Sequence, residues 1–349
     1  MRGKRPVHRR SFWFVPLALS TCALAQSFTV QNSNTHEDLR GLSAVSASII
    51  WASGTHGTYL RTVDGGLIWT VGQVAGAETL DFRDVEAFSA EEAYLLAAGP
   101  GEQSRIYKTS NGGKSWVLQF TNQEPKGFYD CMAFWDRDHG IALGDAIDGV
   151  FEITETGDGG AHWNPIPEPL RPHSLAEEGA FAASGTCIMA KADNLLWFVT
   201  GGNAARVFRS SNRGNTWSAA DVPITHQGAS AGIFSIAVGS PSYVVVGGGD
   251  YKQAEKEGST LAYSEDGGIT WRAFEIRPQF YFSAVALDPA NSRHLLAVGS
   301  ARAVYSDDIE NRAWRASWEM NLNAATFTAP GQALAVGPKG KVVRFTLPR

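Results

Sequence analysis

A short turn sequence recurs along this chain and limits what it can fold into more than any other feature does. The template is Ser/Thr-x-Asp/Asn-x-Gly-x-x-Trp, the pattern called the Asp-box. The Ser/Thr and Asp/Asn side chains can hydrogen-bond nearby backbone groups and hold a tight turn. The glycine supplies a positive-φ position, and the tryptophan buries a large apolar face as the next strand begins. The clear copies contain Asp64, Gly66 and Trp69; Asn111, Gly113 and Trp116; Asp158, Gly160 and Trp163; Asn212, Gly214 and Trp217; and Asp266, Gly268 and Trp271.

The spacing of these copies predicts a ring of similar units. Successive Asp-box tryptophans lie 47 to 54 residues apart, and a degenerate copy that starts at Ser306 reaches Trp314 after 43 residues. A repeat of this length is typical of propeller blades, each of which is a small four-stranded sheet. Because an active site needs one constellation of residues and not a repeated one, we interpret the Asp and Asn side chains of these turns as structural.

The two ends of the chain predict how such a ring closes. After six full repeats, the last unit has only three strand-like runs, 325–328, 333–336 and 342–346, while residues 28–31 form a strand with no blade of its own. Pairing the N-terminal strand with the C-terminal blade would complete it and remove an open edge. We therefore predict an all-β, seven-bladed β-propeller with units of about 46 residues, a usual blade length. Six or eight blades are minor alternatives.

The N-terminus has the features of an export signal. Residues 1–25 carry five basic and no acidic residues, an apolar run over 12–24 and the small-x-small sequence Ala23-Leu24-Ala25. We expect cleavage before Gln26, one propeller domain over 26–349, and a periplasmic or secreted protein. Arg9-Arg10 also resembles a twin-arginine signal. The sequence around Cys22 is a poor lipoprotein box.

Charge excludes some partners. The formal net charge of −5 becomes −10 once residues 1–25 are removed. Such a chain does not favour nucleic acid or an anionic membrane surface, so we expect at most peripheral membrane association.

Two cysteines remain after cleavage, Cys131 and Cys187. Each lies in the expected first strand of a blade, and the two blades are neighbours. An oxidising compartment permits a disulfide. Because inner strands of neighbouring blades diverge and the geometric window for a bridge is narrow, we expect two buried, unbonded side chains.

Propellers bind ligands at the central channel, on the loops that enter first strands and those that join second and third strands. Two inserts, 165–184 and 250–259, add long loops to this scaffold. Asp145 and Asp148 could place two carboxylates on one rim, or could only shape a turn. Glu178 could serve acid–base chemistry, although a solvated loop is the favoured interpretation. The candidate binding residues are Arg40, His56, Arg83, Asp130, Asp145, Asp148, Glu178, Ser184, Asp250 and Tyr251.

Templates for catalysis and cofactors are missing from the sequence. It has no His-Glu-x-x-His or paired-cysteine spacing and no Gly-x-Gly-x-x-Gly fingerprint that leads into a helix. We therefore predict no catalytic residue, no metal and no cofactor.

Several segments resemble a known family. The Thr-x-Asp-Gly-Gly-x-x-Trp blades, second strands such as 295–299 and 333–337, and the segments 179–186 and 248–251 are similar to the Ycf48-like photosystem II stability/assembly factor family and its exported bacterial relatives. The resemblance implies a seven-bladed propeller that acts outside the cytoplasm as a binding or assembly scaffold for a protein or peptide.

The Asp-box also occurs in sialidases and xyloglucan-type glycosidases, so a glycan-binding protein or glycoside hydrolase is the alternative function. The Arg-Ile-Pro segment of sialidases does not occur in this sequence, and xyloglucan-type enzymes resemble two facing propellers where this chain has one. We favour the non-catalytic scaffold.

Overall fold

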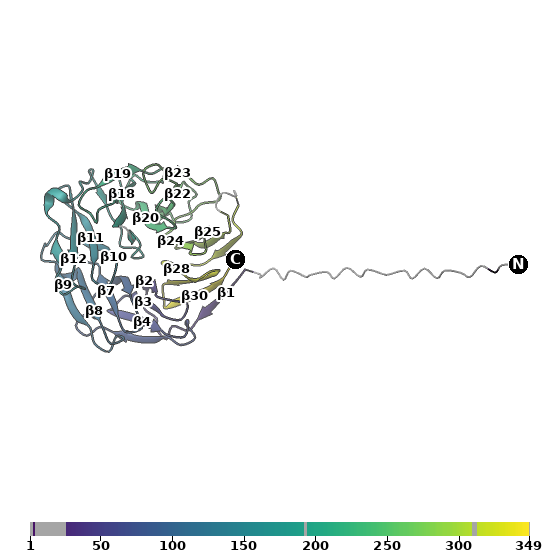
Figure 1. The fold of residues 1–349 in the computed structure, drawn as a ribbon, viewed down its shortest axis with the longest axis horizontal. Helices are drawn as coiled ribbons and strands as arrows, with labels where there is room; N and C mark the ends of the chain where they lie inside the picture. Colours follow the sequence, from purple (N-terminus) through teal and green to yellow (C-terminus); the bar gives the residue numbers. More distant parts are fainter. Residues whose placement is uncertain (1–2, 4–25, 192–193, 309–312, 349) are drawn as a thin grey trace.

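Seven antiparallel sheets stand around a common axis, as Figure 1 shows in a computed structural model. The structure describes residue 3 and residues 26–191, 194–308 and 313–348, so the expected signal peptide lies outside the described residues except for Gly3. The prediction of a seven-bladed β-propeller is confirmed.

Each blade has four strands, which follow one another from the axis outward. Blades 1 to 4 are β2 (Leu39–Ala44), β3 (Ile50–Gly54), β4 (Thr58–Thr62) and β5 (Thr70–Gln73); β6 (Phe82–Ala87), β7 (Ala93–Ala97), β8 (Arg105–Thr109) and β9 (Val117–Thr121); β10 (Tyr129–Phe134), β11 (Gly140–Ile147), β12 (Val150–Thr156) and β13 (Asn164–Pro165); and β15 (Ile188–Lys191), β16 (Leu195–Val199), β18 (Arg206–Ser210) and β19 (Ser218–Asp221). Blades 5 to 7 are β20 (Ala231–Val238), β21 (Val244–Asp250), β22 (Leu261–Ser264) and β23 (Arg272–Ala273); β24 (Ala284–Asp288), β25 (Asn291–Val298), β26 (Arg302–Ser306) and β27 (Ala316–Glu319); and β28 (Ala324–Ala329), β29 (Gln332–Gly337), β30 (Lys341–Thr346) and β1 (Ser27–Gln31).

Burial of the strands follows from this arrangement. Every residue of the second strands β3, β7 and β16 is buried, because each of these strands packs between two neighbouring blades. The sequences of these strands are accordingly continuous apolar runs and do not alternate. The outer strands β5 and β19 are largely exposed and more polar.

The N-terminal strand closes the ring. β1 pairs antiparallel with β30, with Ser27 opposite Thr346 and Gln31 opposite Val342, at the outer edge of blade 7 (Figure 1). On the inner side, Asn323 Nδ2 donates to the carbonyl oxygen of Leu39 at 2.8 Å and so joins blade 7 to blade 1. The predicted closure through the two chain ends is therefore confirmed.

The Asp-box turns have the expected internal hydrogen bonds. In blade 1, the amide of Gly66 donates to Thr62 Oγ1 at 2.8 Å, and the amide of Ile68 donates to Asp64 Oδ1 at 3.0 Å. Gly66 has φ 88°, and a Cβ there would approach the Gln31 side chain to 2.3 Å. A glycine is thus required both by conformation and by the close approach of β1.

The turns also tie neighbouring blades together. Tyr59 of blade 1 donates its hydroxyl to the Gly113 carbonyl of the next turn at 2.6 Å. Equivalent bonds run from Tyr94 to Gly159 at 2.7 Å and from Trp197 Nε1 to Gly267 at 2.7 Å. The repeated motif therefore stabilises contacts between blades.

A disulfide joins Cys131 of β10 to Cys187, with the two Cα atoms 6.0 Å apart. The expectation of two unbonded cysteines was wrong. The inner strands of blades 3 and 4 are packed side by side close to the axis, where the blades have not yet diverged. Their Cα separation lies within the range that a disulfide needs.

Only short 3-10 helices interrupt the described strands: η1 (Gly101–Gln103), η2 (Glu168–Leu170) and η3 (Tyr251–Gln253). In the described part of the chain, no helix has the length and apolar character needed to cross a membrane. The insert before blade 4 contributes β14 (Glu178–Gly179), which pairs with β17 (Gly201–Gly202) and extends the sheet of blade 5 to six strands.

Candidate functional site

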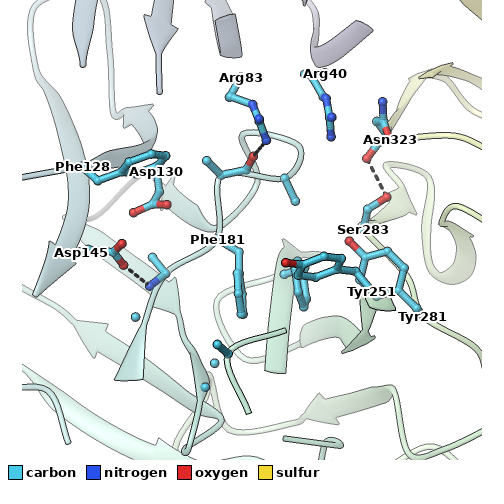
Figure 2. A pocket seen from close by; sticks show the side chains of 18 of the residues that line it. Arg40, Arg83, Phe128, Asp130, Asp145, Phe181, Tyr251, Tyr281, Ser283 and Asn323 are labelled. Carbon is cyan, nitrogen blue, oxygen red and sulfur yellow. Dashed lines mark hydrogen bonds between the residues drawn. The ribbon is translucent and has the colours of Figure 1, made fainter. Parts of the chain in front are cut away.

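A cavity of about 960 Å³ lies at the axis, with walls from all seven blades (Figure 2). We call it the axial cavity. It is lined by the first residues of inner strands, by the loops that enter those strands, and by loops that join second and third strands. None of the described residues of the Asp-box turns lines it. Predicted residues in its lining are Arg40, Arg83, Asp130, Asp145, Glu178 and Tyr251.

In four of the seven blades, a β-bulge in the inner strand directs one side chain into this cavity. In four inner strands the pairing register skips the second or fourth residue, and a bulge of this kind turns the skipped side chain out of the ladder. Each skipped residue follows a buried apolar residue, as Arg40 follows Leu39. The skipped residues are Arg40, Arg83, Asp130 and Phe234.

Two arginines form the basic side of the axial cavity (Figure 2). Arg83 Nη1 donates to the carbonyl oxygen of Ala182 at 3.0 Å, and its Nη2 lies 3.7 Å from Asp81 Oδ2. Arg40 has no hydrogen bond or ion pair with any described residue. Burial, and secondarily the charge of Arg83, lowers the pKa of Arg40. The carboxylates of Asp38 and Asp81 partly offset this effect, so Arg40 is a partly buried cation that interacts with anions only beyond ion-pair distance.

Two aspartates form an acidic side. The amide of Ala180 donates to Asp145 Oδ1 at 2.9 Å, while Asp130 Oδ2 is buried without a partner among the described residues. Burial raises the pKa of both carboxyls, and the neighbouring Asp145 charge raises that of Asp130 further. These shifts favour the protonated forms.

Aromatic rings form the remaining wall. Phe181 stacks on Phe234 with centroids 3.9 Å apart and planes 7° apart. Tyr281 meets Phe234 edge-on at 5.0 Å, and Tyr251 lies 6.4 Å from Tyr281. Tyr251 remains 46% exposed, so this wall has a ring surface open to a ligand.

Part of the first insert runs through the axis and supplies Phe181. We call residues 179–184 the channel segment. It is held by the bonds of Ala180 to Asp145 and of Ala182 to Arg83, and Ser184 Oγ donates to the carbonyl oxygen of Ser283 at 3.0 Å. These bonds attach it to blades 2, 3 and 6, so it forms a fixed part of the cavity wall.

Glu178 precedes the channel segment, and its side chain is fully buried. Its carboxylate accepts hydrogen bonds from Arg206, from Thr200 Oγ1 at 2.6 Å and from the amide of Leu175 at 2.7 Å. The expectation of a solvated loop was wrong, because Arg206 of β18 reaches this glutamate. With these acceptor positions occupied, Glu178 has a structural role and is a poor acid–base group.

Four predicted binding residues do not line the axial cavity. His56 is exposed, with its Nδ1 2.7 Å from Glu37 Oε2. Asp148 is exposed at the tip of the β11–β12 hairpin with φ 50°, so only Asp145 of the expected rim pair faces the cavity. Asp250 accepts from the amide of Lys252 at 3.0 Å at the start of η3. Ser184 is buried within the channel segment.

Five further residues line the cavity and were not predicted from the sequence: Phe181, Phe234, Tyr281, Ser283 and Asn323. A signal for three of them was present. Phe234, Ser283 and Asn323 each follow a buried large apolar residue and precede a small one at the start of an inner strand, as Arg40 does. Among the described residues, no group of three or more His, Cys, Asp or Glu could hold a metal ion.

No protein-family model matches the chain. The photosystem II assembly lipoprotein Ycf48 of Synechococcus sp. (strain CC9902) is 25% identical over 233 residues, which is 66% of this chain. The match spans 60% of that protein, less than two thirds of its length.

Solved propellers align along most of the chain. YCF48 from Cyanidioschyzon merolae gives a TM-score of 0.64 at 16% identity, over 91% of this chain and 98% of that one. The WD40 repeats of RRP9 give 0.65 at 11% identity, over 92% and 97%. A structure of YCF48 bound to a D1 peptide gives 0.45 at 17% identity, over 91% and 96%, an alignment too loose to transfer a binding position.

The ring of Asp-box blades around an axial cavity defines an Asp-box β-propeller. Shape alone does not distinguish its relatives, because the WD40 propeller aligns as well as YCF48 does. The sequence match does distinguish them, because the similarity to Ycf48 extends over 233 residues. The chain is a distant homologue of the Ycf48-like photosystem II assembly factor family.

Proposed function

We propose that this protein is an exported, non-catalytic propeller that binds a segment of a protein or peptide partner in the axial cavity. Arg40 carries the proposal. Its guanidinium is partly buried and its Nε has no hydrogen-bond partner; it makes no ion pair with a described residue, and the carboxylates of Asp38 and Asp81 act on its charge only from beyond ion-pair distance. A carboxylate of the partner would supply the missing ion pair, with Arg83 beside it as a second donor.

The aromatic wall suggests what accompanies that carboxylate. Tyr251 presents exposed ring surface in the cavity that Arg40 and Arg83 also line, which suits an apolar or aromatic side chain near the acidic group. An extended peptide can place both groups within one cavity. The Synechococcus relative is an assembly lipoprotein, which is in keeping with a partner of this kind.

Export is the second part of the proposal. The disulfide between Cys131 and Cys187 is typical of proteins outside the cytoplasm, and the Synechococcus relative is a lipoprotein. Together with the signal-like N-terminal sequence, these observations favour a periplasmic or secreted location.

A peptide-binding experiment tests the proposed function. Labelled peptides that contain a carboxylate next to an aromatic residue should bind the wild-type protein, and Arg40→Ala should weaken binding by about tenfold or more, as expected for loss of a charged hydrogen bond of about 1.5–3 kcal/mol. Arg272→Ala, on the exposed outer strand β23, is the matched control and should bind as the wild type does. Equal binding by the Arg40 variant would refute the cavity as the site.

A glycan ligand is the second candidate. Asp130 and Asp145 have raised pKa values and lie beside aromatic rings, a combination that also suits a sugar ring and an acid group. A glycan array would reveal binding, and Asp145→Ala would test for turnover. If neither glycan binding nor turnover is detected, a glycan ligand is excluded.

A further inference from the structure

A second cavity adjoins the axial cavity. It has a volume of about 480 Å³ and shares Ser300 and Asn321 with the first, so the two cavities meet at these residues. Both residues lie in loops on the same side of the ring, after β25 and before β28. We call this second cavity the side groove; its other lining residues include Glu255, Phe280, Arg302, Glu319 and Met320.

The charges of the side groove are opposite to those at Arg40. Arg302 is already engaged: its guanidinium lies 5.0 Å from the Phe280 ring centroid, and its Nη2 is 3.5 Å from Glu319 Oε1. Glu319 is nevertheless 83% exposed, and Glu255 has no ion pair with any described residue. The groove therefore has one paired cation and two accessible carboxylates, whereas Arg40 in the axial cavity makes no ion pair with a described residue.

We propose that the side groove binds the continuation of the partner segment, and that this continuation carries a lysine or arginine. The inference rests on the proposed function, since it requires a partner whose acidic group sits at Arg40. The basic side chain would meet Glu319 and Glu255, and its aliphatic stem would contact Phe280 and Met320. The partner is thus an extended peptide with an acidic group followed along the chain by a basic one.

Opposite charges at the two ends would also set the direction of binding. A peptide in the reverse orientation places its basic residue at Arg40 and its acidic residue at Glu319, and both contacts are repulsive. Because the groove carboxylates are exposed, each charge should change affinity by only about threefold to tenfold, and high salt should weaken the effect.

The test is a charge-swap experiment with a panel of labelled peptides. All share the carboxylate–aromatic pair, and each carries a single Lys, Ala or Glu that is moved through the following positions. At one or two of these positions, the wild type should bind the Lys peptide most tightly and the Glu peptide with the same position most weakly. The double variant Glu255→Lys/Glu319→Lys should reverse that order of affinities. Glu319→Gln should make the difference in affinity between the Lys and Glu peptides smaller.

Controls separate the inference from the proposed function. Glu155→Lys, on the exposed face of β12 in blade 3, should retain the wild-type order, and thermal unfolding should show that every variant is folded. If peptides bind in an Arg40-dependent way but Lys, Ala and Glu peptides bind alike, the side groove is not part of the site and the proposed function stands. If no peptide binds the wild type, both fail.

Discussion

Glu86, on the inner strand β6, has a side chain in an unusual state. Burial raises its pKa to about 7, although the charge of Lys191 partly offsets this effect. Burial, and secondarily the charge of Glu86, also raises the pKa of Asp84, two residues earlier on β6, whose Oδ2 accepts a hydrogen bond from the amide of Met132 at 2.7 Å. The inner ring thus holds acidic groups that favour protonation near neutral pH.

Stability should therefore depend on pH through Glu86. A carboxyl whose folded-state pKa is raised contributes stability that is present below its unfolded pKa of 4.5 and is lost as pH rises through about 7. The Glu86→Gln variant has no carboxyl to ionise at this position. Its unfolding free energy relative to that of the wild type should therefore be about 1–3 kcal/mol higher at pH 8 than at pH 5. Urea unfolding of both proteins at the two pH values measures this difference. A constant difference would show that the pKa is not raised.

The sequence predicted several cavity residues for a physical reason. Arg40, Arg83 and Asp130 occupy the start of an inner strand, and that position is set by the repeat. Phe181 was missed because its place depends on the path of an insert. That path is fixed by Asp145, Arg83 and Ser283, which lie far away in the sequence.

At the scale of elements, the disulfide links the inner strand β10 of blade 3 to the residue just before β15, the inner strand of blade 4. Cys187 lies three residues beyond Ser184, and its partner Cys131 is on β10 of blade 3. The two cysteines are 56 residues apart, so closing this loop restricts the unfolded chain considerably.

Cys131→Ser/Cys187→Ser should accordingly lower the unfolding free energy by about 4 kcal/mol in the chain-entropy model. Reducing agent should lower the stability of the wild type toward that of the variant and leave the variant unchanged. Urea unfolding with and without a reductant is the measurement, and mass spectrometry of the oxidised protein verifies the bond. A wild type that is insensitive to reductant would contradict a disulfide that stabilises the fold.

Long-range pairing explains why the bridge was not predicted. Local patterns located both cysteines in inner strands, but the expected divergence of blades applies to their outer parts. Near the axis the inner strands are packed together, and only the closed ring determines how close they come.

For the whole molecule, the repeated motif allowed the architecture to be predicted from the sequence. The Asp-box period set the blade count, and the short last unit together with residues 28–31 indicated the closure that β1 and β30 form. The same regularity says nothing about the ligand, because the cavity is built from positions at which the blades differ: Arg40, Asp130, Phe234 and Asn323 occupy comparable places in different blades.

The central claim is that the axial side of the ring, and not its Asp-box rim, recognises the partner. Site-specific photo-crosslinking tests it most directly, with benzoylphenylalanine in place of Tyr251 at the cavity or in place of Leu67, which is 80% exposed in the blade 1 turn. In envelope extracts, position 251 should crosslink a discrete partner, Arg40→Ala should abolish that product, and position 67 should give none. A partner that crosslinks at position 67 and not at 251 would contradict the account.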